Sequence, residues 1–204
     1  MSARIRQVEH IEGNFSTSVY IELSPENSVA IDSYSDKAQE LLRQFTEQPA
    51  IKHTAYHLSL SRNVFLKPHL IEQFMSAMDR VLSRLNESVL YLKPEFRIYF
   101  NDSWNTAFVA IPVDLDISAN AMALLHSVDS VFQRFDLPQF YTNPSPHVSL
   151  ASACSDIGFK RLEESSIKVK EIQVDDDSLE QLRVDTSCVT VSVGQRIHRI
   201  HLKS

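Results

Sequence analysis

The stretch Tyr56-His57-Leu58-Ser59-Leu60-Ser61 decides the fold, because Pro146-His147-Val148-Ser149-Leu150-Ala151 repeats its pattern 90 residues later. Both segments read histidine, an apolar residue, serine and leucine. Side chains alternate between the two faces of a β-strand, so the histidine and the serine of each copy share one face. The apolar residues point to the other face and anchor the strand in a core. We therefore predict two strands that each present an imidazole and a hydroxyl group to one surface.

Strand and helix signals alternate along the rest of the chain. Strands are expected where apolar and polar residues alternate, and helices where apolar residues recur every three or four positions. The expected strands cover residues 18–23, 56–61, 96–100, 107–113, 147–151, 167–174, 182–193 and 196–202, and the expected helices cover residues 34–45, 68–85 and 120–135. This order predicts an α+β fold of antiparallel sheet with flanking helices. It also indicates two pseudo-symmetric lobes around a central groove, each lobe carrying one His-x-Ser motif.

A single two-lobed domain is expected across residues 1–204. The chain has 43% apolar residues, enough for one substantial core, and only three glycines. It lacks a Pro/Gly/Ser-rich linker that would separate two folding units. No apolar run approaches the roughly 20 residues of a membrane-spanning helix, so we expect a soluble intracellular protein without a membrane partner.

The charge balance favours a small, local binding site over a broad nucleic-acid surface. The formal net charge is −6, whereas proteins that bind nucleic acid through many phosphates usually carry an excess of Lys and Arg. We expect recognition of one or a few nucleotides. Cys154 and Cys188 lack the paired spacing of a zinc site and are expected to be buried free thiols. The sequence therefore predicts neither a metal site nor a cofactor.

Two imidazoles and two hydroxyl groups around one point fit the cleavage of a phosphodiester bond in RNA. An unperturbed histidine has a pKa of about 6.5, so one can take a proton while the other gives one. The base would act on a 2′-hydroxyl group, whose oxygen attacks the adjacent phosphorus, and the acid would protonate the departing 5′ oxygen. Ser59 and Ser149 would donate hydrogen bonds to the non-bridging oxygens. We assign His57 as the base and His147 as the acid, although the symmetry of the motifs leaves the order open.

The chain resembles the U6 small nuclear RNA phosphodiesterase family, within the superfamily of two-histidine phosphoesterases. The twin His-x-Ser strands carry the likeness to the superfamily. The closer likeness lies in Gly13-Asn14-Phe15, in Val19-Tyr20-Ile21, in the longer first motif and in Phe140-Tyr141-Thr142-Asn143-Pro144-Ser145-Pro146-His147. It covers roughly residues 9–202, nearly the whole chain.

This resemblance implies a 3′ to 5′ exoribonuclease that trims the oligouridine tail of U6 RNA in the nucleus. The product would end in a 2′,3′-cyclic phosphate or a 3′ phosphate. His57 and His147 match the catalytic histidines, and Tyr141 matches the aromatic residue that stacks on the terminal base. The serines of both motifs match the phosphate-binding hydroxyls. Further residues expected beside the nucleotide are Ser145, Pro146, Leu58, Val148 and Asp102. Because one chain supplies both motifs, we expect a monomer.

Two alternatives stay open. One is a two-histidine cyclic phosphodiesterase that acts on a small nucleotide, and the other is a nucleotide-binding adaptor without catalysis. Intact histidines and serines in both motifs favour an enzyme over the adaptor. Pro146 departs from the family's pattern, and so does the absence of Trp after Ala151. These departures leave open whether uridine is preferred over adenosine.

Overall fold

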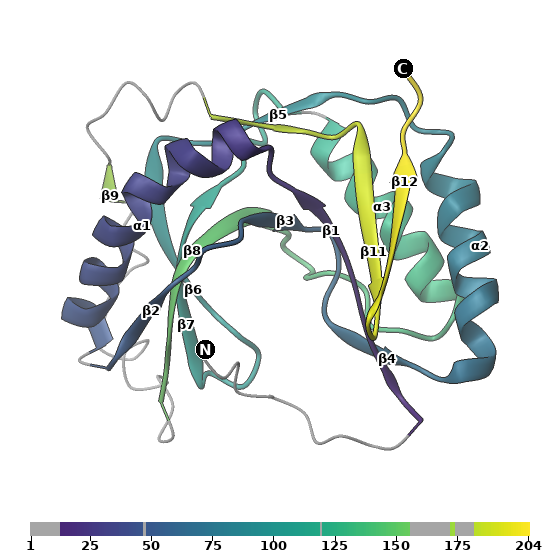
Figure 1. Cartoon of the computed structure of the whole chain (residues 1–204), viewed down its shortest axis with the longest axis horizontal. Helices are drawn as coiled ribbons and strands as arrows, with labels where there is room; N and C mark the ends of the chain where they lie inside the picture. Colours follow the sequence, from purple (N-terminus) through teal and green to yellow (C-terminus); the bar gives the residue numbers. More distant parts are fainter. Residues whose placement is uncertain (1–12, 47, 119, 156–171, 174–181) are drawn as a thin grey trace.

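The chain has a mixed α+β fold that is built on one large antiparallel sheet (Figure 1). The computed structural model describes residues 13–46, 48–118, 120–155, 172–173 and 182–204. Within this part of the chain, the strands are β1 (Phe15–Glu22), β2 (Ala50–Lys52), β3 (His57–Ser59), β4 (Val64–Leu66), β5 (Val89–Tyr91), β6 (Glu95–Phe100), β7 (Thr106–Pro112), β8 (His147–Cys154), β9 (Ile172–Gln173), β10 (Arg183–Asp185), β11 (Cys188–Val193) and β12 (Arg196–His201). The helices are α1 (Pro25–Thr46), α2 (Ile71–Leu82), which follows a 3₁₀ turn at Pro68–Leu70, and α3 (Asn120–Arg134).

The sheet brings the two predicted motif strands next to each other. Ten of the described strands join it, in the order β12-β11-β1-β3-β8-β7-β6-β9, with β2 paired to β8 and β4 paired to β1. β3 holds the first motif and β8 holds the second. The two halves of the sheet therefore meet at the motifs, while β5 and β10 pair as a separate ribbon.

The described helices pack on the apolar face of the sheet. α1 covers the half that contains β2, β7 and β8, and its Tyr34 meets Phe96 of β6 edge-on with ring centroids 6.5 Å apart. α2 packs against α3, where the rings of Phe74 and Phe132 lie 5.6 Å apart, and against the β11–β12 hairpin. In Figure 1, α1 lies on the left and α2 and α3 lie on the right. The strand residues that face these helices form the core, which leaves the opposite face for polar side chains.

Most expected elements are present with shifted ends, but the single strand expected at residues 182–193 is wrong: it is divided into β10 and β11, which belong to different sheets. α1 begins at Pro25 instead of residue 34; proline fits a first helical turn, and Glu26 is favourable there because of the helix dipole. β8 continues to Cys154 because both β2 and β7 pair with its last residues. The unpredicted strands β2, β4 and β5 span three residues each, too few to show a period. The strand expected at residues 167–174 lies outside the described residues, apart from β9.

The expected burial of both thiols is wrong for Cys154 and only partly met by Cys188. Cys154 is an exposed free cysteine, because it is the last residue of β8 and lies at the end of the strand. Cys188, the first residue of β11, is half-buried. Burial raises the pKa of the Cys188 thiol, so this group stays protonated at neutral pH.

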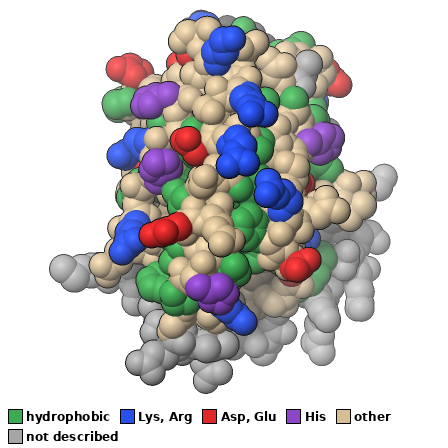
Figure 2. Space-filling model, turned by 90° about the vertical axis from the view of Figure 1, so that its right-hand side faces the viewer, with side chains coloured by type: hydrophobic (Ala, Val, Ile, Leu, Met, Phe, Trp, Pro, Cys, Tyr) green, Lys and Arg blue, Asp and Glu red, His purple; other side chains and the backbone are tan. Residues whose placement is uncertain are grey.

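The outer side of the α2 half is polar and mixed in charge. Figure 2 shows Lys and Arg side chains in a loose column on this face, with Asp and Glu side chains scattered among them. Exposed Glu72 and Arg80 of α2 belong to the polar side of the helix, whereas Phe74 and Met78 are fully buried. This alternation is typical of a solvated amphipathic helix. In the described part of the chain, none of the helices combines the length and the apolar character that a membrane span requires.

Candidate active site

The two His-x-Ser strands pair directly with each other. Leu58 on β3 lies opposite Val148 on β8 in an antiparallel register. One step along each strand, this register sets position 57 beside position 149, and position 59 beside position 147. Each histidine therefore neighbours the serine of the other motif. Directly opposite residues have Cβ atoms about 5 Å apart, so the four side chains form one compact group.

Buried neighbours determine the direction in which the motif side chains point. Leu58 and Val148 are 0% exposed, and the register extends their row to the buried Ile21 on β1 and Ile111 on β7. This apolar row belongs to the core. The opposite face of the sheet carries the four partly exposed motif residues His57, Ser59, His147 and Ser149. Leu58 and Val148, which were expected beside the nucleotide, can reach that face only through their backbones.

Two contacts hold the imidazole of His147. Its Nδ1 atom lies 2.8 Å from the carbonyl oxygen of Ser145. Because a carbonyl oxygen only accepts hydrogen bonds, Nδ1 carries the hydrogen and Nε2 keeps its lone pair. The ring of Tyr99 stacks on the imidazole, with centroids 3.9 Å apart and planes 17° apart. Both contacts restrain the ring while its Nε2 atom stays available for proton transfer.

The same surroundings keep His147 uncharged. Burial lowers its pKa from 6.5 to about 4; the hydrogen bond to Ser145 opposes this effect, and the nearby charge of His57 adds to it. At pH 7 His147 is therefore a neutral imidazole with a free lone pair. This state suits an atom that takes a proton.

His57 lies beside charged and aromatic groups of β1. The Tyr20 ring is tilted by 60° to the His57 ring, with centroids 5.2 Å apart. Glu22 is opposite His57 in the β1–β3 register and pairs with Arg199 of β12, with 3.3 Å between nitrogen and oxygen. The environment of His57 is thus more polar than that of His147.

Tyr141 and Asp102, expected separately at the site, meet at Arg62. The Arg62 guanidinium lies over the Tyr141 ring, 4.2 Å from its centroid, and donates a hydrogen bond of 2.9 Å to Asp102. Tyr141 is 41% exposed. Burial raises the pKa of its hydroxyl, Asp102 adds to this shift and Arg62 opposes it. Because Arg62 directly follows the motif segment that ends at Ser61, this cluster lies close to the end of that motif.

Ser145 and Pro146, expected to line the nucleotide pocket, make contacts within the protein. The Ser145 hydroxyl forms a 2.9 Å hydrogen bond with the Tyr99 hydroxyl. Pro146 is buried, and its carbonyl oxygen accepts a 2.8 Å hydrogen bond from the Val113 amide. Tyr99 was missed in the sequence analysis. Its only signal was the alternation of the 96–100 strand, which puts Tyr99 on the face opposite Phe96.

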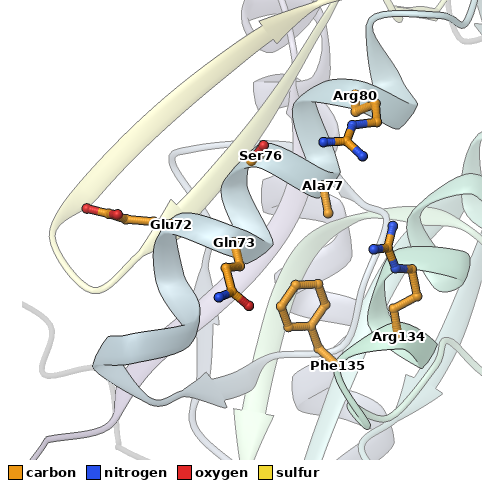
Figure 3. Close-up of a pocket in the computed structure, with 7 residues that line it drawn as sticks. All are labelled: Glu72, Gln73, Ser76, Ala77, Arg80, Arg134 and Phe135. Atoms are coloured by element: carbon orange, nitrogen blue, oxygen red, sulfur yellow. The ribbon is translucent and has the colours of Figure 1, made fainter.

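Two hollows of the structure lie away from the motif residues. One, of about 420 Å³, lies between α2 and α3 and is lined by Glu72, Gln73, Ser76, Ala77, Arg80, Arg134 and Phe135 (Figure 3). The other, of about 600 Å³, lies between α2 and the β11–β12 hairpin and is lined by Ile71, Glu72, Met75, Val191, Val193, Arg196, Ile197 and His198. Among the described residues, no three His, Cys, Asp or Glu side chains gather as metal ligands would.

The fold is that of the two-histidine phosphoesterases. It matches a structure of Kluyveromyces marxianus Usb1 with uridine monophosphate at a TM-score of 0.65 and 14% sequence identity, over 93% of this chain and 98% of that chain. It also matches Escherichia coli LigT in its apo form at a TM-score of 0.61 and 11% identity, over 95% of this chain and 100% of that chain.

Sequence comparisons identify the family. Residues 2–201 match the family model described as "HVSL: Uncharacterised conserved protein", and the second motif reads His147-Val148-Ser149-Leu150. U6 snRNA phosphodiesterase 1 of Bos taurus is 32% identical over 98% of this chain and 74% of its own length. The protein of the same name from Dictyostelium discoideum is 28% identical over 72% of this chain and 54% of its own length, so the chain spans about half of that relative. The chain belongs to this family of U6 snRNA phosphodiesterases.

Proposed function

We propose that this protein is an RNA phosphodiesterase that removes nucleotides one at a time from the 3′ oligouridine tail of U6 small nuclear RNA. The direct pairing of β3 with β8 carries this proposal, because it gathers two imidazoles and two hydroxyl groups on one face of the sheet. The choice of U6 RNA as the substrate rests on the name of the relatives, U6 snRNA phosphodiesterase 1.

The cleavage step needs one proton acceptor and one proton donor. The base takes the proton of the 2′-hydroxyl group of the penultimate nucleotide, and the resulting oxygen attacks the phosphorus that links this nucleotide to the last one. The bond from phosphorus to the 5′ oxygen of the last nucleoside breaks, and the acid protonates that oxygen. The RNA is left with a 2′,3′-cyclic phosphate. Water can then open this ring to a 3′ phosphate, with the roles of acid and base exchanged.

The surroundings of the histidines favour His147 as the base and His57 as the acid. This order is the reverse of the one assigned from the sequence. A neutral His147 with a free Nε2 lone pair is ready to take a proton at pH 7, whereas its lowered pKa makes it a poor store of a proton. The role of the acid then belongs to His57, beside the polar end of β1.

Ser59 and Ser149 bind the phosphate group, and Tyr141 binds the nucleobase. A hydroxyl donor next to each histidine suits the non-bridging oxygens, where negative charge concentrates in the transition state. Tyr141 keeps 41% of its surface exposed, which leaves room for a nucleobase to stack. Arg62, which is paired with Asp102, lies over the Tyr141 ring and restrains it.

We further propose that residues 1–204 form one domain and that the protein acts as a monomer in the nucleus. Both motifs come from one chain and pair within one sheet, so a second copy is not needed to complete the site. The two imidazoles supply the acid and the base, and the protein positions the substrate between them. The proposed reaction therefore needs no metal ion or other cofactor.

The test is to incubate the purified protein with a 3′-oligouridylated RNA in excess EDTA, beside His57→Ala and His147→Ala variants, and to determine the 3′ ends by mass spectrometry. We expect stepwise shortening by the wild-type protein and none by either variant. Cleavage of small cyclic nucleotides without shortening of RNA would replace the proposal with the small-nucleotide alternative. Tight RNA binding without any product would support the adaptor instead.

A further inference from the structure

Tyr99 reaches His147 from a strand that is not its neighbour. Tyr99 belongs to β6 and His147 to β8, and β7 lies between them. The two rings nevertheless stack at 3.9 Å with planes only 17° apart. Ala110 of β7, which pairs with both Arg97 and Ser149, is a small, fully buried residue and leaves space above β7 for a large side chain.

The Tyr99 hydroxyl completes a closed set of contacts around His147. It forms a 2.9 Å hydrogen bond with the Ser145 hydroxyl, and the carbonyl oxygen of the same Ser145 accepts the Nδ1 hydrogen of His147 at 2.8 Å. Tyr99 therefore restrains the plane of the imidazole through stacking and the acceptor of its Nδ1 hydrogen through Ser145. The hydrogen bond acts at Nδ1 and the stacking acts on one face of the ring, so neither restraint occupies the Nε2 lone pair.

The environment of Tyr99 fixes the tyrosine itself. Burial raises the pKa of its hydroxyl, so the group remains protonated at neutral pH. On the same strand, Arg97 and Glu95 form an ion pair of 2.6 Å, and Arg97 also interacts with the Tyr99 hydroxyl. These contacts keep the Tyr99 side chain in one position, so its ring can restrain the imidazole of His147.

We propose that Tyr99 is a positioning residue that fixes the ring plane and the tautomer of His147 for proton transfer from the 2′-hydroxyl group of RNA. This inference rests on the proposed function. Tyr99 touches His147 and Ser145, whereas the reacting atoms meet only Nε2. A misplacement of about 1 Å at a reacting group costs about a hundredfold in rate, so loss of this restraint has a measurable effect.

Two variants separate stacking from hydrogen bonding. Tyr99→Leu removes both contacts, and we expect kcat to fall by about tenfold to a hundredfold while KM changes by less than about twofold. Tyr99→Phe keeps the stacked ring and loses one hydrogen bond, so we expect a fall of about fivefold. Tyr91→Leu, on the separate β5–β10 ribbon, is the matched control and leaves kcat unchanged. Circular dichroism and thermal melting confirm that each variant is folded.

A second readout reports on His147 without any turnover. ¹⁵N NMR of the imidazole gives its tautomer and its titration midpoint in the free protein. We expect the midpoint to move in Tyr99→Leu from about 4 towards the ordinary value of 6.5, together with loss of the single Nδ1–H tautomer. An unchanged tautomer and midpoint, or an unchanged kcat, would overturn the positioning role. If the wild-type protein is inactive but the titration midpoint of His147 still moves in Tyr99→Leu, the proposed function is wrong. The positioning of His147 by Tyr99 is then still supported.

Discussion

Leu58 on β3 faces Val148 on β8 across the middle of the sheet, and both side chains are 0% exposed. This apolar pair lies directly beneath the four motif side chains. It therefore joins the core to the site, because any shift of either strand moves a histidine relative to its neighbouring serine.

Leu58→Ala tests the structural part of this link. Removing a fully buried leucine side chain leaves a cavity, so we expect the free energy of unfolding to fall by about 2 to 5 kcal/mol. Urea titration followed by circular dichroism measures the change. Ile51→Ala, on β2 and 48% exposed, is the control and is expected to cost less than about 1 kcal/mol. Equal losses in the two variants would contradict the central place of Leu58 in the core.

The serines of the two motifs are expected to act on the rate. Ser59→Ala and Ser149→Ala each remove a hydrogen-bond donor to the phosphate oxygens, so kcat should fall by about a hundredfold to a thousandfold. Single-turnover cleavage of an oligouridylated RNA measures this fall. Ser192→Ala on β11 removes a half-buried hydroxyl group that the proposed site does not use, and its activity should match the wild type. A loss below about threefold at both motif serines would remove them from the phosphate site.

The pH dependence of kcat/KM tests the lowered pKa of His147, on which its assignment as the base rests. With His147 as the base, protonation of this residue removes activity at low pH, so the acid limb of the profile lies at about pH 4, far below the ordinary histidine value. With His147 as the acid, only roughly a thousandth of the protein would hold the required proton at pH 7. An acid limb near pH 6.5, the ordinary histidine value, would contradict the lowered pKa of His147 and remove the reason for assigning it as the base.

Tyr141 is expected to contribute through stacking. Tyr141→Ala should lower kcat/KM for an oligouridylated RNA by about fivefold to 150-fold, because a base stacked on an aromatic ring gains about 1 to 3 kcal/mol. Tyr141→Phe keeps the ring and should stay within about twofold of the wild type. Equal losses in the two variants would show that the hydroxyl group, rather than the ring face, serves the substrate.

The sequence could predict the motif strands because the decisive feature is local. The alternation of His57, Leu58 and Ser59 shows which side chains share a face. The structure confirms that Leu58 is buried and that His57 and Ser59 are partly exposed. The helical spacing around Phe74 and Met78 is equally local, and α2 is present there. The start of α1 at Pro25 was missed because Ile31 is its single buried apolar residue before Tyr34.

The remaining features depend on contacts between distant segments. Nothing in the period of either strand shows that β3 and β8, 90 residues apart, pair directly. The stacking of Tyr99 on His147 crosses an intervening strand, and the Arg62–Asp102 pair joins residues that are 40 positions apart. The lowered pKa of His147 follows from the same packing. For this reason the sequence leaves open which histidine is the base, whereas the surroundings in the structure favour His147 as the base and His57 as the acid.

The most direct test of the two-histidine mechanism uses an RNA in which the attacking group is missing. We expect a 2′-deoxy substitution in the penultimate nucleotide to abolish removal of the last nucleotide, since no 2′-hydroxyl group is present for His147 to deprotonate. The matched RNA carries the substitution in the last nucleotide only and should lose that nucleotide at the normal rate, leaving a 2′,3′-cyclic phosphate or a 3′ phosphate by mass. Equal cleavage of both RNAs in excess EDTA would show that water attacks directly, and would contradict the proposed transesterification.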